Sequence, residues 1–153
     1  MKSPRKPSSN LEKMVYNGIE LDRCPETGGV WFDADELYEL TSNMKRDDDF
    51  LEKFGGDWED FGEAEAEGGC PRGHGKMTPF VVKKVNGEGD ITLDICQKCL
   101  GIWVDGAELG MLQDVTLHNK ENGGPPTIEP MKKNQVLSLV SMLNPMTWIN
   151  KAL

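Results

Sequence analysis

The chain has 153 residues, of which only 37% are apolar, and its 17 glycines and 9 prolines leave little material for one large hydrophobic core. No run of residues approaches the roughly 20 apolar positions of a membrane-spanning helix, and no apolar run follows the basic N-terminus as in a secretory signal. We therefore expect a reducing, cytoplasmic setting, where clustered cysteines are more often metal ligands than disulfides.

Two segments of the chain repeat one another. Residues 21–33, LDRCPETGGVWFD, align with residues 93–105, LDICQKCLGIWVD, so that Cys24 corresponds to Cys96, 72 positions later. In both copies the tryptophan is followed by Asp-x-x-Glu-Leu. The chain is thus predicted to contain two related modules of about 40 residues, a size that seldom folds without a metal, a disulfide or a partner.

A β-hairpin is predicted before each copy. In the first, Asn17-Gly18 favours a type I′ turn between short apolar runs, and in the second the connection is longer and looser. The expected strands are residues 14–16 and 19–21 in the first copy, and residues 81–85 and 91–95 in the second.

A short helix is predicted after each hairpin. Asp33 and Asp105 are suited to be N-caps, and Glu36 and Glu108 stand where a capping box places its glutamate. Leucines at helical spacing follow in each copy. Paired acids could instead serve acid–base chemistry, but capping explains the pattern with fewer requirements.

Acidic residues are concentrated between the two copies. Residues 47–67 contain ten acidic residues and one basic residue, while the rest of the chain is electrically balanced and the net charge is −9. Such a run is typical of a solvated connector. Aromatic residues interleaved with the charges leave two other interpretations open, a docking strip for a basic partner or packing back onto the neighbouring modules.

The second copy contains a candidate metal site. Cys96 and Cys99 form a C-x₂-C turn after a strand, and Cys70 and His74 form a C-x₃-H pair before the hairpin. Three thiolates and one imidazole make a closed tetrahedral set, which is typical of structural zinc, Zn²⁺. Unmetallated thiols are the simpler alternative, and His118 is a rival fourth ligand only if the chain folds back after the helix.

The first copy lacks this donor set. Cys24 keeps its place, but Thr27 replaces the second cysteine of the turn, and Ser3 and Lys6 stand where the upstream pair is expected. One thiolate does not hold zinc. We therefore expect the first module to retain the fold without the ion.

These motifs resemble the zinc ribbon of the TFIIB-type transcription-factor zinc-finger family. Matching positions in the second copy include Cys70, Cys96, Cys99, Gly101 and Trp103, whereas Gly73 stands where a cysteine is usual and His74 is the substitute. Residues 16–37 match the second half of the pattern. The resemblance implies tandem ribbons with the first one degenerate, but it does not imply a transcription factor, since function does not follow from fold.

The fold expected is small α+β, with two ribbon-like modules, each a β-hairpin plus a short helix, and a C-terminal helix. The amphipathic pattern of that helix comprises Val136, Leu139, Val140 and Leu143, and it packs on the modules, on a partner or second copy, or on a membrane surface. The expected boundaries are 1–45 for the metal-free module, 46–68 for the acidic linker, 69–116 for the zinc module, 117–129 for a second linker and 130–153 for the helical segment.

Two functions from different classes follow. The first is a non-enzymatic adaptor that binds an unidentified protein partner. The second is a nucleic-acid-associated regulator, which the isoelectric point near 4.7 argues against, because binding to phosphates depends on Lys and Arg. Neither a nucleophilic triad nor an open metal site is visible, so we expect no enzyme.

Overall fold

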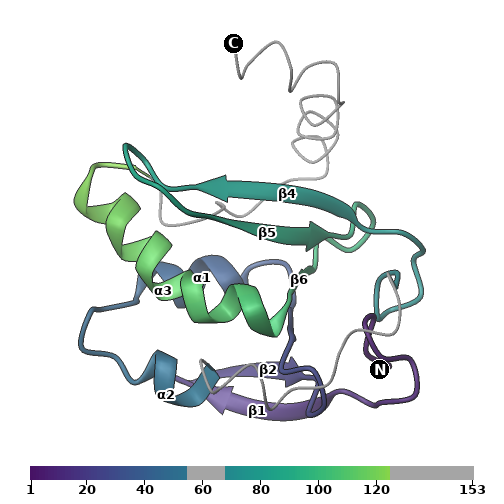
Figure 1. Cartoon of the computed structure of the whole chain (residues 1–153). Helices are drawn as coiled ribbons and strands as arrows, with labels where there is room; N and C mark the ends of the chain where they lie inside the picture. The colour runs from purple at the N-terminus through teal and green to yellow at the C-terminus, as the bar shows by residue number, and fades with distance from the viewer. Residues whose placement is uncertain (55–67, 125–153) are drawn as a thin grey trace, which may run out of the picture.

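Both repeats belong to one antiparallel sheet (Figure 1). The computed structural model describes residues 1–54 and 68–124. Within them the strands are β1 (Glu12–Tyr16), β2 (Ile19–Arg23), β3 (Val30–Phe32), β4 (Thr78–Lys83), β5 (Asp90–Ile95) and β6 (Ile102–Val104). The helices are α1 (Glu36–Ser42), α2 (Phe50–Phe54) and α3 (Gly106–Glu121). The sheet order β1-β2-β3-β6-β5-β4 confirms the small α+β class.

The first hairpin has the predicted turn. Asn17 and Gly18 have φ values of 50° and 80°, both left-handed as a type I′ turn requires, and Tyr16 pairs with Ile19. In the second hairpin, Lys83 pairs with Asp90 across a longer connection. Side chains alternate between buried and exposed along β5, as expected for strands with one covered face.

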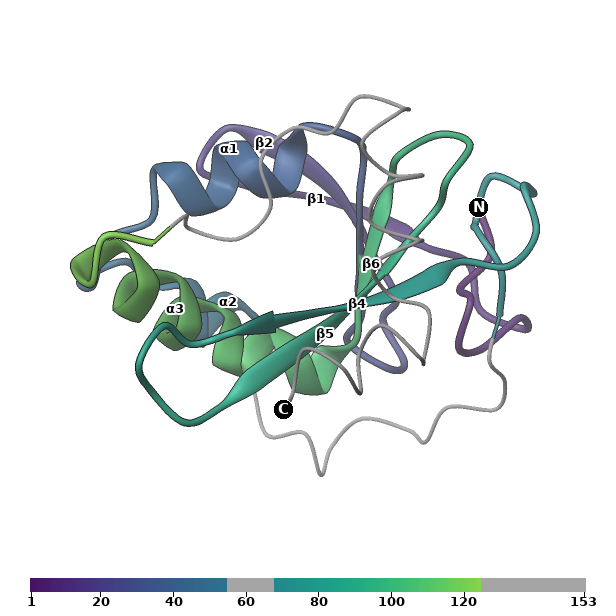
Figure 2. The same cartoon turned by 90° about the horizontal axis from the view of Figure 1, so that it is seen from above.

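The centre of the sheet is the antiparallel pair β3 and β6, which places Trp31 opposite Trp103. All six residues of these two strands are buried. The two hairpins extend from this pair on opposite sides of α1 and α3 (Figures 1 and 2). One element from each repeat thus forms the junction, which we call the central seam and define as β3, β6 and the residues their tryptophans contact.

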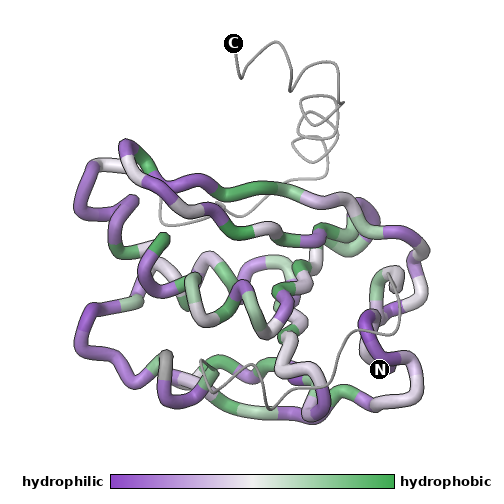
Figure 3. Tube along the Cα trace, in the orientation of Figure 1, coloured by the Kyte–Doolittle hydropathy of each residue, from purple (hydrophilic) through white to green (hydrophobic). Residues whose placement is uncertain are grey.

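The hydrophobic core is shared between the repeats. One cluster of buried apolar residues includes Leu21 and Phe32 from the first repeat and Leu93 and Leu109 from the second. Hydrophobic positions recur along β5 and α3, which contact each other (Figure 3). A second, smaller cluster lies around the tryptophans and contains Cys24, Trp31, Cys70, Cys96 and Trp103.

The beginning of the acidic segment packs into this core. Phe50 and Phe54 on α2 are buried, and the ring of Tyr16 meets them edge-on at centroid distances of 5.7 and 5.2 Å. For these two aromatic residues, the structure agrees with packing back onto a module rather than with a fully solvated connector. Residues 55–67 lie outside the described residues.

Helix α3 also holds the end of α1. The ammonium group of Lys120 donates to the carbonyls of Thr41, Ser42 and Met44 at 3.2, 2.9 and 3.2 Å. The carbonyls of Thr41 and Ser42 belong to the last turn of α1 and that of Met44 follows it, and a cation at this end compensates unpaired acceptors. The sequence analysis placed the end of the zinc module at residue 116, but α3 continues to Glu121. Lys120 lies in this additional part of the helix.

The predicted capping differs from what is observed. The N-cap of α1 is Asp35, not Asp33, and neither Asp35 nor Asp105 caps its helix with its side chain. Glu36 does accept the amide of Asp33, at 2.7 Å, but Glu108 accepts the amide of Thr92 instead. The Asp33 and Asp105 carboxylates instead accept hydrogen bonds from indole and guanidinium groups. The guanidinium is a cation and is therefore a stronger partner for an anion than a backbone amide.

The predicted amphipathic helix within residues 130–153 lies outside the described residues. Among the described helices, none has the length and apolar character needed to cross a membrane.

We predict that Phe54→Ala will lower the free energy of unfolding by about 3 to 5 kcal/mol, because a buried aromatic side chain is removed from the core. Chemical denaturation followed by circular dichroism measures this loss. Glu52→Ala, at an exposed position on the same helix, is the control and should change stability by less than about 0.5 kcal/mol. Equal effects of the two substitutions would show that α2 does not contribute to the core.

Candidate metal centre

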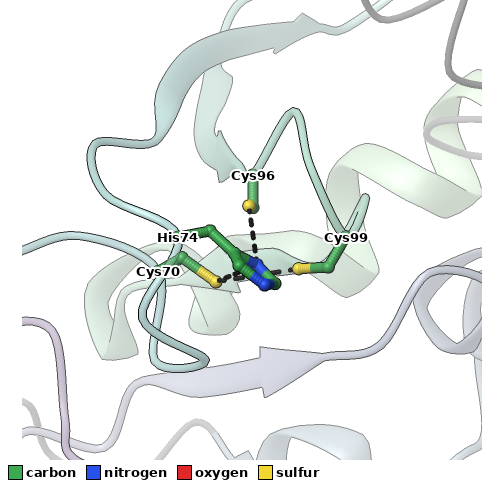
Figure 4. A group of neighbouring side chains, drawn as sticks. All are labelled: Cys70, His74, Cys96 and Cys99. Carbon is green, nitrogen blue, oxygen red and sulfur yellow. Dashed lines mark hydrogen bonds between the residues drawn. The ribbon is translucent and has the colours of Figure 1, made fainter.

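Four potential ligands converge from two loops (Figure 4). Cys70 and His74 come from the loop before β4, and Cys96 and Cys99 come from the turn after β5. Their donor atoms all lie within 4.8 Å of one another. The structure therefore brings together the four residues that the sequence singled out as a set.

The distances within the set suit a tetrahedral ion. The Cys70 and Cys99 sulfurs are 3.7 Å apart, and His74 Nδ1 lies 3.6 Å from the sulfurs of both Cys70 and Cys96. Tetrahedral zinc, with bonds of about 2.3 Å to sulfur and about 2.0 Å to nitrogen, separates two sulfurs by about 3.8 Å and a sulfur from a nitrogen by about 3.5 Å. The donors thus fit a zinc-sized ion, with Nδ1 as the ligand atom of His74.

Glycines bring His74 into position. Gly73 and Gly75 have φ values of 84° and 88°, a left-handed conformation that other residues rarely adopt. The Cys70 amide donates to the carbonyl of Gly75 at 2.8 Å, which closes the loop around the imidazole. This geometry explains how a C-x₃-H spacing delivers its second ligand one residue later than a C-x₂-C spacing would.

The C-x₂-C turn is tight and contains one unusual residue. Cys96 donates to the Gly101 carbonyl at 2.9 Å, and Leu100 donates back to the Cys96 carbonyl at 2.8 Å. Leu100 has a φ of 64°, which is uncommon for a residue with a branched side chain. The backbone of this turn is therefore strained at the position next to Cys99.

Burial changes the pKa values of the three thiols. Loss of contact with water disfavours the thiolate, which raises the pKa of Cys70 and raises the pKa of Cys99 to about 12. Burial also opposes ionisation of Cys96, but hydrogen bonds from the Cys99 and Lys98 amides outweigh it and lower the pKa of that thiol. Without an ion, Cys70 and Cys99 thus carry protons at neutral pH.

His118 lies elsewhere. Its Nε2 is 2.6 Å from the carbonyl oxygen of Val85, at the end of the second hairpin. The position on α3 keeps this imidazole outside the donor group.

The first repeat has a counterpart of the same turn without the four-residue donor set. Cys24 donates to the Gly29 carbonyl at 2.8 Å and Gly28 donates to the Cys24 carbonyl at 2.9 Å, which reproduces the pattern around Cys96. Ser3 Oγ accepts the amide of Arg5 at 3.3 Å, much as Cys70 Sγ accepts the amide of Arg72 at 3.4 Å. Hydroxyl groups take the place of thiols in this loop.

Hydroxyls also surround the remaining thiol. Ser9 Oγ lies 3.9 Å from Cys24 Sγ, and both residues are buried. Burial alone would raise the pKa of Cys24, but hydrogen bonds from Ser3 and Thr27 outweigh it and lower the pKa. Sequence reasoning identified Ser3 and Thr27 as replacements and missed Ser9, which no ligand spacing marks.

Two arginines connect the loops to the opposite repeat, and the sequence analysis did not predict their role. Arg72, two residues after Cys70, donates to Asp33 Oδ1 at 3.1 and 2.7 Å. Arg5, two residues after Ser3, donates to Asp105 at 2.9 Å and also pairs with Asp94. The repeated Pro-Arg dipeptides were the signal available for these contacts.

Comparison with known proteins gives a match to a protein family. The model of the TFIIB-type zinc-ribbon family, described as a transcription factor zinc-finger, matches residues 7–43. The match overlaps the resemblance found at residues 16–37, and it falls on the repeat without the donor set. No curated protein and no solved structure matches.

We predict that metal binding will release at least two protons per ion at neutral pH, because the thiols of Cys70 and Cys99 must lose their protons to coordinate. Their raised pKa values also make the apparent affinity increase with pH. Release into weakly buffered solution can be followed with an indicator dye during titration with metal. Binding without proton release, with an affinity independent of pH between about 6 and 8, would contradict these pKa shifts.

Proposed function

We propose that Cys70, His74, Cys96 and Cys99 bind one structural Zn²⁺ and that the protein is a non-enzymatic adaptor. The observation that supports this most strongly is the spacing of the four donor atoms, which suits a tetrahedral ion. Soft thiolates favour zinc over magnesium or calcium. Because four protein ligands fill the coordination sphere, no position remains for a reactive water, and the centre supports the fold rather than catalysis.

We also propose that the two halves are tandem ribbon-like modules and that the first has lost its metal. The matching backbone hydrogen bonds around Cys24 and Cys96 support this relationship. The family match at residues 7–43 supports it from the sequence side. In the first module, hydrogen-bonded hydroxyls and the aromatic cluster of α2 would compensate for the missing ion.

The partner in this proposal is a protein, contacted by surfaces outside the metal centre. The acidic residues of segment 47–67 and the predicted amphipathic helix of residues 130–153 are the candidate contact regions, and that helix also offers a route to self-association. Three cysteines acting as metal ligands suit a reducing compartment such as the cytoplasm.

X-ray absorption at the zinc edge tests the metal assignment. We expect one zinc per chain with three sulfur neighbours and one nitrogen neighbour. His74→Ala should weaken zinc binding clearly by removing the nitrogen ligand, and His118→Ala, a matched imidazole loss, should leave it unchanged. A shell made only of sulfur, or similar effects of both substitutions, would exclude His74 as the fourth ligand.

A regulator that binds nucleic acid is the second candidate, and the description of the matched family favours it. The basic residues near the metal centre give it little support. Arg72 is paired with Asp33 and Lys84 is paired with Asp114, so these two cations are already neutralised.

We predict no sub-micromolar binding to DNA or RNA at physiological salt, because acidic residues repel phosphates within a Debye length of about 8 Å. Gel shifts with the zinc-loaded chain at several salt concentrations measure this. Deletion of residues 55–67 is the control for autoinhibition by the acidic segment. Tight, salt-sensitive binding by the intact chain would instead favour the regulator.

A further inference from the structure

Trp31, from the first repeat, packs on the metal-binding turn of the second. A β-carbon added to Gly101 would come within 2.0 Å of Cζ2 of Trp31. Gly101 belongs to the turn itself, since its carbonyl accepts the amide of Cys96. The indole ring thus lies directly against the backbone that presents Cys96 and Cys99.

The same contact occurs in reverse on the metal-free side. A β-carbon on Gly29 would come within 2.2 Å of Cζ2 of Trp103, and the Gly29 carbonyl accepts the amide of Cys24. The two tryptophans therefore make equivalent contacts with two turns of different chemistry. This pairing provides a matched control within one molecule.

A second contact joins the first repeat to the other pair of donors. The amide of Arg72 donates to Cys70 Sγ at 3.4 Å, and its guanidinium is bound by Asp33. Asp33 also accepts the indole N–H of Trp31 at 3.2 Å. Trp31 and Asp33 are thus linked, and together they contact both loops that supply ligands.

The turn that contains Cys96 and Cys99 needs contacts from the first repeat more than the corresponding turn around Cys24 needs contacts from the second. Leu100 is left-handed with a φ of 64°, whereas the equivalent position in the first repeat is Gly28, with a φ of 73°. Glycine adopts this conformation without strain, but leucine does not. A strained backbone persists only when surrounding contacts hold it.

We propose that Trp31 and Asp33 are positioning residues for the metal centre, through which the first repeat keeps the two donor pairs at coordination distance. The inference rests on the proposed zinc site and goes beyond it, because it gives the metal-free repeat a role in metal affinity. Coupling between sites is reciprocal, so a bound ion stabilises the central seam in return.

Zinc affinity of Trp31→Phe and Trp103→Phe in the full chain tests the proposal. Phenylalanine removes the part of the indole that reaches the glycine and also removes its N–H donor. By competition with a chromophoric chelator, we expect Trp31→Phe to bind zinc about tenfold more weakly, the lower end of the range for residues supporting metal ligands. Trp103→Phe should bind zinc as the wild type does, although both variants melt at lower temperatures.

Asp33→Asn and Asp105→Asn form a second pair of variants, which removes a charge and no side-chain volume. This pair tests the proposal if a tryptophan variant does not fold. Each aspartate accepts an indole N–H and an arginine contact. The arginine bound to Asp33 also donates its amide to the ligand Cys70, whereas the arginine bound to Asp105 donates its amide to Ser3. We expect weaker zinc binding and an altered thiolate-to-Co²⁺ absorption band for Asp33→Asn alone. The melting temperatures of the two metal-free variants should be similar.

The outcomes separate the two proposals. If the wild-type chain binds no zinc, the proposed function fails. If the wild type binds zinc and the two members of each pair have equal affinities, the positioning role is overturned while the zinc site stands.

Discussion

Reciprocal packing of two tryptophans across β3 and β6 is the constraint on which the rest of this structure depends. Each indole ring occupies the space next to a glycine of the opposite repeat, where a β-carbon would collide with it. The seam therefore fixes the relative position of the two repeats and of both cysteine-containing turns. Because the apolar residues on either side merge into one cluster, neither repeat has a complete core by itself.

The two turns reach the same backbone geometry by different chemistry. In the second repeat, a strained turn and a glycine-flanked imidazole present four donors whose spacing suits an ion. In the first, Gly28 removes the strain, and Ser3, Ser9 and Thr27 surround Cys24 with hydroxyl groups. Hydrogen bonds contribute about 1 kcal/mol each, far less than the roughly 10 kcal/mol of a structural metal. The buried aromatic residues of α2 add stabilisation on that side.

The asymmetry gives the two repeats complementary roles in the proposed adaptor. In this proposal the second repeat holds the ion, and the first contributes an aromatic ring and a carboxylate that contact the loops around the site. With four protein ligands the metal centre has no open position for a partner, so the proposed adaptor binds its partner through other surfaces. The net negative charge of the chain is concentrated in the segment between the repeats. The beginning of that segment is anchored by Phe50 and Phe54 in the shared core, so its acidic residues begin at a fixed place on the molecule.

The sequence by itself determined the features that depend on neighbouring residues. Asn17-Gly18 requires left-handed φ values that specify a hairpin, and the spacings of Cys70, His74, Cys96 and Cys99 identified a donor set that the fold does bring together. Only the tertiary structure decided the contacts between distant segments, because local patterns do not specify which strands pair or which charges meet. It joined β3 to β6, buried Phe50 and Phe54, and placed Lys120 at the end of α1. It also placed the Asp33 carboxylate against Arg72 and Trp31 rather than at a helix cap. A carboxylate binds a cation from another segment more strongly than it binds a backbone amide of the neighbouring helix.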